Sequence, residues 1–139
     1  MELNEAACIS DTPVGAGLPS VLALAFLGDA RHSLHVRKML VMRGITKSGQ
    51  LSTEAQRYVS AEAQAKMWGG IKGLMRDCEL GVYRRAYNSK HLNKPKRAAG
   101  SDYRSATGFE AVVGMLLWLG EEERLNMILD AACAVIDKE

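Results

Sequence analysis

The stretch LALAFLGDARHSLHVRKML, residues 22–40, places a single carboxylate, Asp29, inside a largely apolar helical pattern. Its apolar residues recur at spacings of three and four, which puts them on one face of an α-helix, and Asp29 falls on that face. Pro19 and Ser20 suit the start of this helix, and Gly44 suits the position just after its end. A buried ionised carboxylate is costly unless other groups compensate its charge. The stretch therefore predicts a central helix in which Asp29 has a partner, which is either Arg, Lys or water along the helix face, or a metal ion.

A second apolar helix is predicted at residues 103–119, YRSATGFEAVVGMLLWL, and it too carries one acid, Glu110. Thr107 and Gly114 share a face with Glu110, and Gly114 leaves room for the close approach of another helix or a ligand. If the two helices pack together, Asp29 and Glu110 converge and can hold a hard divalent cation such as Mg²⁺, which prefers oxygen ligands. The alternative is that Glu110 is an isolated carboxylate on the rim of the fold.

The remaining segments also have helical patterns. Thr53 with Gln56 matches a capping box and predicts the start of a helix that runs to about residue 66. Gly69 and Gly70 are expected to break or bend this helix. Because no segment alternates as a strand does, the predicted fold class is all-α, with two further helices at residues 79–88 and 121–138.

The chain has 139 residues, a length typical of a single domain. Residues 1–18 contain Pro and Gly with little periodicity and are predicted to be a flexible arm, whereas residues 19–139 form the folded domain. No apolar run approaches the roughly 18 residues of a membrane span, and the N-terminus has no basic region before an apolar segment. The predicted location is therefore the cytoplasm.

Cysteine and histidine give no sign of a structural zinc site. The three cysteines form no CxxC pair, and no His stands at a zinc-ligand spacing from them. His32 follows Asp29 by three residues and could orient it, but ordinary packing or exposure is favoured for both His32 and His35.

Charge is distributed unevenly along the chain. Residues 84–104 hold seven basic residues against one acid, a net charge of +6, whereas residues 110–139 hold seven acids against two basic residues, a net charge of −5. The basic loop at residues 89–101 precedes the Glu110 helix and is a candidate phosphate-binding surface, although such a loop is often merely solvated. The basic residues are Arg84, Arg85, Lys90, Lys94, Lys96, Arg97 and Arg104.

Five ordered blocks of this sequence resemble a known family. FLGDA (residues 26–30) and ATGFEAVVG (106–114) are similar to the two signature segments of the ribonuclease III catalytic domain. TEAQRYVSAEAQAKM (53–67), YRRAYNSK (83–90) and the Glu-rich LGEEERL (119–125) follow the same family order. The likeness is closest to mini-ribonuclease III, the short bacterial form that has no separate double-stranded RNA-binding domain.

The resemblance implies a ribonuclease III-type helical endonuclease domain. In such a domain Asp29 and Glu110 are the catalytic residues and ligands of Mg²⁺, and the seven basic residues of segment 84–104 bind double-stranded RNA. The expected reaction is hydrolysis that leaves 5′ phosphates and 3′ hydroxyls. The expected assembly is a homodimer, and the expected substrate is the precursor of 23S ribosomal RNA, with a ribosomal protein as a possible helper.

Three positions depart from the family patterns. Ala25 and Thr107 stand where full-length ribonuclease III has carboxylates, a reduction that the short form shares. Ser33 stands where the short form commonly has Glu. Two other interpretations of the whole chain are a catalytically silent relative that binds RNA or ribosomes, and a helical protein-interaction domain.

Overall fold

The computed structural model describes residues 17–90 and 100–139. Within these ranges the chain forms α-helices and one short 3-10 turn and no strand, so the predicted all-α class is confirmed. The elements are α2 (Val21–Met42), α3 (Ser48–Val59), α4 (Ala61–Ile71), the 3-10 turn (Lys72–Leu74), α5 (Asp77–Tyr87), α6 (Gly100–Trp118) and α7 (Glu122–Asp137).

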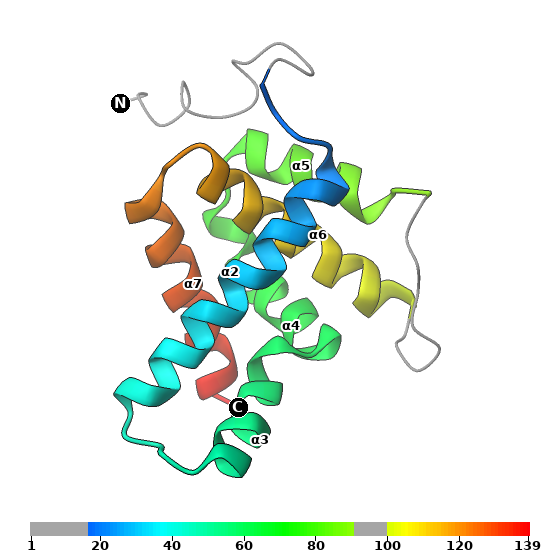
Figure 1. The fold of residues 1–139 in the computed structure, drawn as a ribbon. Helices are drawn as coiled ribbons and strands as arrows, with labels where there is room; N and C mark the ends of the chain where they lie inside the picture. The colour runs from blue at the N-terminus through cyan, green and yellow to red at the C-terminus, as the bar shows by residue number, and fades with distance from the viewer. Residues whose placement is uncertain (1–16, 91–99) are drawn as a thin grey trace.

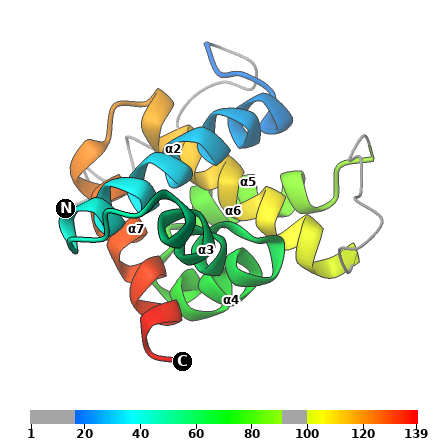
Figure 2. The ribbon, with the colours of Figure 1, turned by 60° about the horizontal axis from the view of Figure 1, so that its bottom comes forward.

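Helix α6 forms the centre of the fold. Helix α2 lies across it, and α4 and α5 pack against its other sides (Figures 1 and 2). Every residue from Ser105 to Leu116 is buried except Glu110, which is partly exposed. Glu110 is therefore the one place along this central segment where the helix reaches solvent.

Two glycines bring α2 and α6 into backbone contact. A Cβ atom at Gly28 would collide with the backbone carbonyl of Glu110, and a Cβ atom at Gly114 would collide with the backbone carbonyl of Leu24. Glycine is required at both positions because any side chain would push the helices apart. The close approach expected at Gly114 is thus present, and Gly28 provides its counterpart on α2.

The ends of α2 match the sequence prediction, and its buried face matches in part. The Ser20 hydroxyl accepts a hydrogen bond from the Ala23 backbone N–H at 3.2 Å, and Gly44 has a φ of +90° just past the helix end. Of the predicted apolar face, Ala25, Val36 and Leu40 are buried, but Phe26 is 85% exposed and Asp29 is exposed. The Gly28 contact turns the helix so that Leu24, Gly28 and His32 complete the buried face.

The predicted boundaries of the second helical region are wrong. Helix α3 already begins at Ser48, and Thr53 lies inside it with its hydroxyl donating to the Gly49 carbonyl at 3.0 Å. The chain breaks instead at Ser60, whose hydroxyl accepts from the Ala63 backbone N–H at 3.1 Å and caps α4.

The two glycines at residues 69 and 70 do not end α4, which continues to Ile71. Gly70 lies against the side chain of Val135, where a Cβ atom would collide. Its small size therefore serves the packing of α4 on α7 and does not interrupt the helix.

The predicted arm at residues 1–18 lies outside the described residues except at its end. There the Gly17 carbonyl accepts a hydrogen bond from the Trp118 indole N–H at 2.9 Å, which ties the entry of α2 to the end of α6. Among the described residues, no helix combines the length and the apolar character that crossing a membrane requires.

Candidate functional site

The helix crossing places Asp29 and Glu110 side by side. Gly28 lies against the backbone of Glu110, and the next residue on α2, Asp29, interacts with the Glu110 side chain directly. Asp29 is the exposed member of the pair and Glu110 is the largely buried one. The exposure of Asp29 differs from the prediction, because the sequence pattern places Asp29 on the apolar face of its helix.

Glu110 is held in a setting that opposes its ionisation. Burial, followed by the negative charge of Asp29, raises the pKa of Glu110 to about 8, and a hydrogen bond from Gln64 offsets this only in part. At neutral pH the carboxyl group is therefore mostly protonated when no cation is present. A positive charge at this position would stabilise the ionised form of both acids.

A second buried glutamate, Glu79, shows how arginine side chains compensate a buried negative charge in this fold. Burial disfavours the charge of Glu79, but hydrogen bonds from Arg124 and Arg76 outweigh it and lower the pKa of Glu79. The Arg124 Nε and Nη2 atoms lie 2.7 Å from its two oxygens. By contrast, in residues 17–90 and 100–139 no Arg or Lys forms an ion pair with Asp29 or Glu110.

Gln64 is a member of this site that sequence analysis missed. It lies on α4, is 2% exposed, and donates from Nε2 to the Val59 carbonyl at 2.9 Å. It also hydrogen-bonds the Glu110 side chain. A signal existed in the sequence, because Gln64 shares a helix face with the apolar Met67, Trp68 and Ile71, so its amide had to be buried.

The chemistry of this cluster fits a hard divalent cation. Two carboxylates and an amide offer only oxygen donors, which suit Mg²⁺ better than zinc. The Gln64 Oε1 atom is buried and has no hydrogen-bond partner in residues 17–90 and 100–139, so a lone pair is left for a ligand or its water. No group of three or more His, Cys, Asp or Glu side chains in the described part of the chain forms a metal cluster.

The two histidines near Asp29 have packing roles. His32 is fully buried and donates from Nε2 to the Tyr58 carbonyl at 2.8 Å, and burial lowers its pKa, so the ring is neutral. Its edge also packs on the Phe109 ring, with centroids 5.3 Å apart. His35 instead contacts Asp130 on α7 at 2.8 Å.

The described basic residues belong to the last turn of α5, the segment just after it and the first turns of α6. Figure 1 shows that the end of α5 and the start of α6 lie on the same side of the molecule. Arg84, Arg85 and Lys90 are exposed. Arg104 is also exposed and donates to the Tyr87 carbonyl at 2.8 Å, which joins α6 to α5. Arg104 precedes Glu110 by six residues, or about 9 Å along the helix. The other three predicted contacts, Lys94, Lys96 and Arg97, lie outside the described residues.

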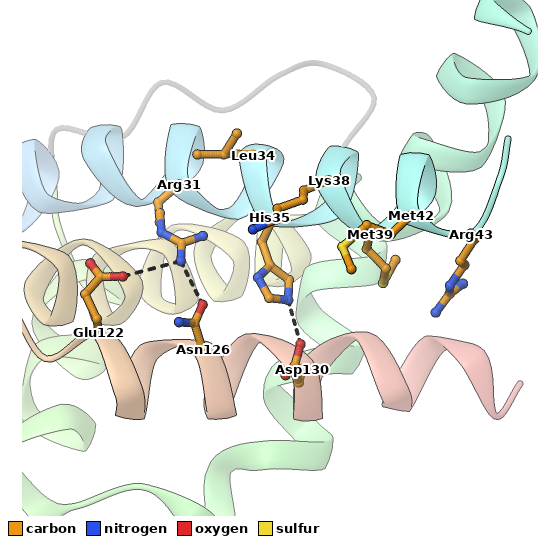
Figure 3. Close-up of a pocket in the computed structure, with 10 residues that line it drawn as sticks. All are labelled: Arg31, Leu34, His35, Lys38, Met39, Met42, Arg43, Glu122, Asn126 and Asp130. Carbon is orange, nitrogen blue, oxygen red and sulfur yellow. Dashed lines mark hydrogen bonds and ion pairs between the residues drawn. The ribbon is translucent and has the colours of Figure 1, made fainter. Parts of the chain in front are cut away.

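A separate concavity lies between α2 and α7, away from the acidic pair (Figure 3). It measures about 650 Å³ and contains neither Asp29 nor Glu110. Its polar side chains are largely paired across the groove, since Arg31 donates to Asn126 at 2.9 Å and His35 contacts Asp130 at 2.8 Å. These pairs hold α7 against α2, so the polar groups of the groove serve the packing of the two helices. The acidic pair is therefore the candidate catalytic site.

Comparison with known proteins identifies the class. The model of the ribonuclease III domain family matches residues 22–120, a span that includes the whole of α6 and the acidic pair. The chain therefore belongs to the ribonuclease III family of endoribonucleases. The family is in general metal-dependent, which agrees with the oxygen donors of the site.

Within this family, the similar proteins are of the short form. The chain is 43% identical to a mini-ribonuclease 3 of Brevibacillus brevis, over 88% of this chain and 91% of that protein. It is 37% identical to a mini-ribonuclease 3 of Streptococcus pneumoniae, over 84% of this chain and 92% of that protein. A crystal structure of a Fusobacterium nucleatum protein matches with a TM-score of 0.72 at 30% identity, covering 80% of this chain and 88% of that one.

Proposed function

We propose that this endoribonuclease cleaves double-stranded RNA with Mg²⁺ held by Asp29 and Glu110. The observation that carries the proposal is the contact between exposed Asp29 and largely buried Glu110, two acids with which no Arg or Lys of residues 17–90 and 100–139 forms an ion pair. Such a pair is unstable as two bare carboxylates and becomes favourable when a divalent cation binds.

The two acids have different tasks in this mechanism. Asp29, which faces solvent, would hold the ion from the side that is open to RNA. Glu110, fixed in the central helix, would give up its proton and hold the ion from the side of the core. When bound, the ion would supply an activated water for in-line attack on the phosphodiester and would stabilise the charge on the leaving 3′ oxygen. The products are 5′ phosphates and 3′ hydroxyls.

The basic residues at the junction of α5 and α6 are proposed to hold the RNA backbone. The side chains of Arg84, Arg85, Lys90 and Arg104 are exposed and so are open to RNA phosphates. Lys94, Lys96 and Arg97 belong to the same proposal through the sequence alone. Duplex RNA suits such a surface because its recognition rests on phosphates and 2′-hydroxyls more than on bases.

Cleavage of both strands needs two sites, and the exposed face of α2 supports a homodimer. Phe26 is 85% exposed on this face, one turn before Asp29. Ser33 and Arg37 share that face of the helix, and they line a groove of about 300 Å³ between α2 and α3. A second copy that received Phe26 near this groove would bury an aromatic ring and bring two acidic pairs together across a two-fold axis.

The natural substrate proposed is the precursor of 23S ribosomal RNA in the cytoplasm. The affinity for this substrate is proposed to come from the catalytic domain, from RNA shape and from a helper. A ribosomal protein that presents the RNA is the helper proposed here. The sequence likeness to mini-ribonuclease 3 proteins supports this assignment.

The decisive experiment compares wild type with Asp29→Asn on a labelled RNA duplex, with Mg²⁺ and with a chelator. Wild type should cleave only with the metal ion, and Asp29→Asn should bind RNA without cleaving it. Because Asp29 is exposed, this variant should keep the wild-type melting temperature. The control is Glu123→Gln, a change at an exposed acid on α7 away from the acidic pair. Binding without cleavage by wild type would favour the catalytically silent relative instead.

A further inference from the structure

The Gln64 amide has an orientation that its partners determine. The Val59 carbonyl can only accept a hydrogen bond, so the amide atom 2.9 Å from it must be the nitrogen, Nε2. Oε1 is therefore the other amide atom. It is buried and has no hydrogen-bond partner among the described residues.

A buried amide oxygen without a partner is costly, and native structures seldom keep one without a use. The cost here arises next to Glu110, whose side chain hydrogen-bonds the same amide. The amide nitrogen is used, since it donates to the Val59 carbonyl and to Glu110. The oxygen has no such use among the described residues, and a cation held by the adjacent acidic pair would give it one.

We propose that Gln64 is the third oxygen donor of the metal site, with Oε1 facing the hydrated cation that Asp29 and Glu110 hold. The inference rests on the proposed metal-dependent function and adds to it a neutral ligand from α4. The amide suits this role because Nε2 is anchored on Val59 at the end of α3, which fixes the direction of Oε1. A neutral oxygen also adds no further negative charge beside Glu110, whose ionisation is already opposed by Asp29.

The test measures Mg²⁺ binding to purified protein by calorimetry and by the rise in melting temperature that Mg²⁺ causes. Gln64→Met removes the oxygen at similar volume and should weaken Mg²⁺ binding by about 10- to 100-fold, the usual effect of losing a supporting group at a metal site. Gln64→Glu keeps an oxygen at this position but loses the Nε2 anchor on Val59, so it should bind Mg²⁺ more tightly than Gln64→Met does. Gln56→Met, an exposed change on α3, is the matched control.

The other outcomes overturn the proposal. If Gln64→Met and Gln64→Glu lose affinity to the same extent, the amide acts only through its N–H groups on Glu110 and not as an oxygen donor. If both keep wild-type affinity and only lower the melting temperature, Gln64 is a packing residue. If wild type binds no Mg²⁺ and cleaves no duplex with it, the proposed function itself fails, and the comparison of variants is not needed to show this.

Discussion

The Cα atom of Gly28 lies against the backbone carbonyl of Glu110, so α2 and α6 touch backbone to backbone at the turn that carries both acids. The contact explains how two acids from distant parts of the chain come together. It also fixes which face of α2 is buried, and so leaves Asp29 and Phe26 open to solvent.

Gly28→Ala should destabilise the protein by about 3 kcal/mol, because the new methyl group would collide with a backbone carbonyl that cannot move aside. Urea unfolding measures the loss. The matched control is Gly69→Ala, inside α4 with open space around its Cα, where Ala should stabilise by up to about 1 kcal/mol through its better helix propensity. Equal effects of the two changes would contradict the close helix contact.

Mg²⁺ binding should depend on pH because Glu110 must lose its proton to bind the ion. With the Glu110 pKa at about 8, apparent affinity should rise about tenfold per pH unit below pH 8 and level off above it. Calorimetry in buffers of different ionisation enthalpy would detect the released proton. In Glu110→Gln both the proton release and most of the affinity should disappear. Affinity that stays constant from pH 6 to 8 in wild type would argue against Glu110 as a ligand.

Stability of the metal-free protein should fall as pH rises from about 4.5 to about 8. The folded-state pKa of Glu110 is raised, so in this window the folded protein binds more protons than the unfolded chain, and stability decreases with pH. Glu110→Gln should remove this contribution and stabilise the metal-free protein at pH 8 by a few kcal/mol, since one pKa unit is about 1.4 kcal/mol. Thermal unfolding across pH measures it, with exposed Glu123→Gln as the control expected to change nothing.

The proximity of Asp29 and Glu110 could be predicted from local sequence features that are also present in the folded structure. Each acid interrupts an apolar helical pattern, and glycines nearby permit close packing of the two helices. The burial of each acid could not be predicted, because it depends on the rotation of α2, which the contact at Gly28 decides. The apolar pattern alone predicts that Phe26 is buried. The backbone contact at Gly28 instead orients the helix so that Phe26 is exposed.

The break between α3 and α4 was mispredicted for a similar reason. Thr53 and Ser60 are both good N-cap residues, and local propensity does not choose between them. In the fold, the break at Ser60 leaves the Tyr58 and Val59 carbonyls free to accept from His32 and Gln64. Tertiary partners, which a single sequence does not reveal, thus account for both the break and the site residue that was missed.

Replacing Lys94, Lys96 and Arg97 with Ala should weaken duplex RNA binding and flatten its salt dependence. Each lost phosphate contact reduces the slope of log affinity against log salt by somewhat less than one. Titration of a labelled duplex at several salt concentrations measures both effects. The control replaces three lysines of other segments, Lys47, Lys66 and Lys138, at the same change in net charge. Unchanged affinity in the first variant would exclude this loop as the main RNA contact.

Phe26→Arg should convert a homodimer into a monomer. An aromatic side chain that is 85% exposed one turn before Asp29 is costly in water, and a second copy would bury it, whereas a charged guanidinium at the two-fold interface would oppose association. Sedimentation measures the change. The control is Met42→Arg, which is 76% exposed at the α2/α7 groove on another face of α2 and should stay dimeric. Because each protomer holds one acidic pair, the Phe26→Arg monomer should lose paired cuts across a duplex while it remains folded. A wild-type protein that is monomeric at the concentration where it cuts both strands would contradict the proposed dimer.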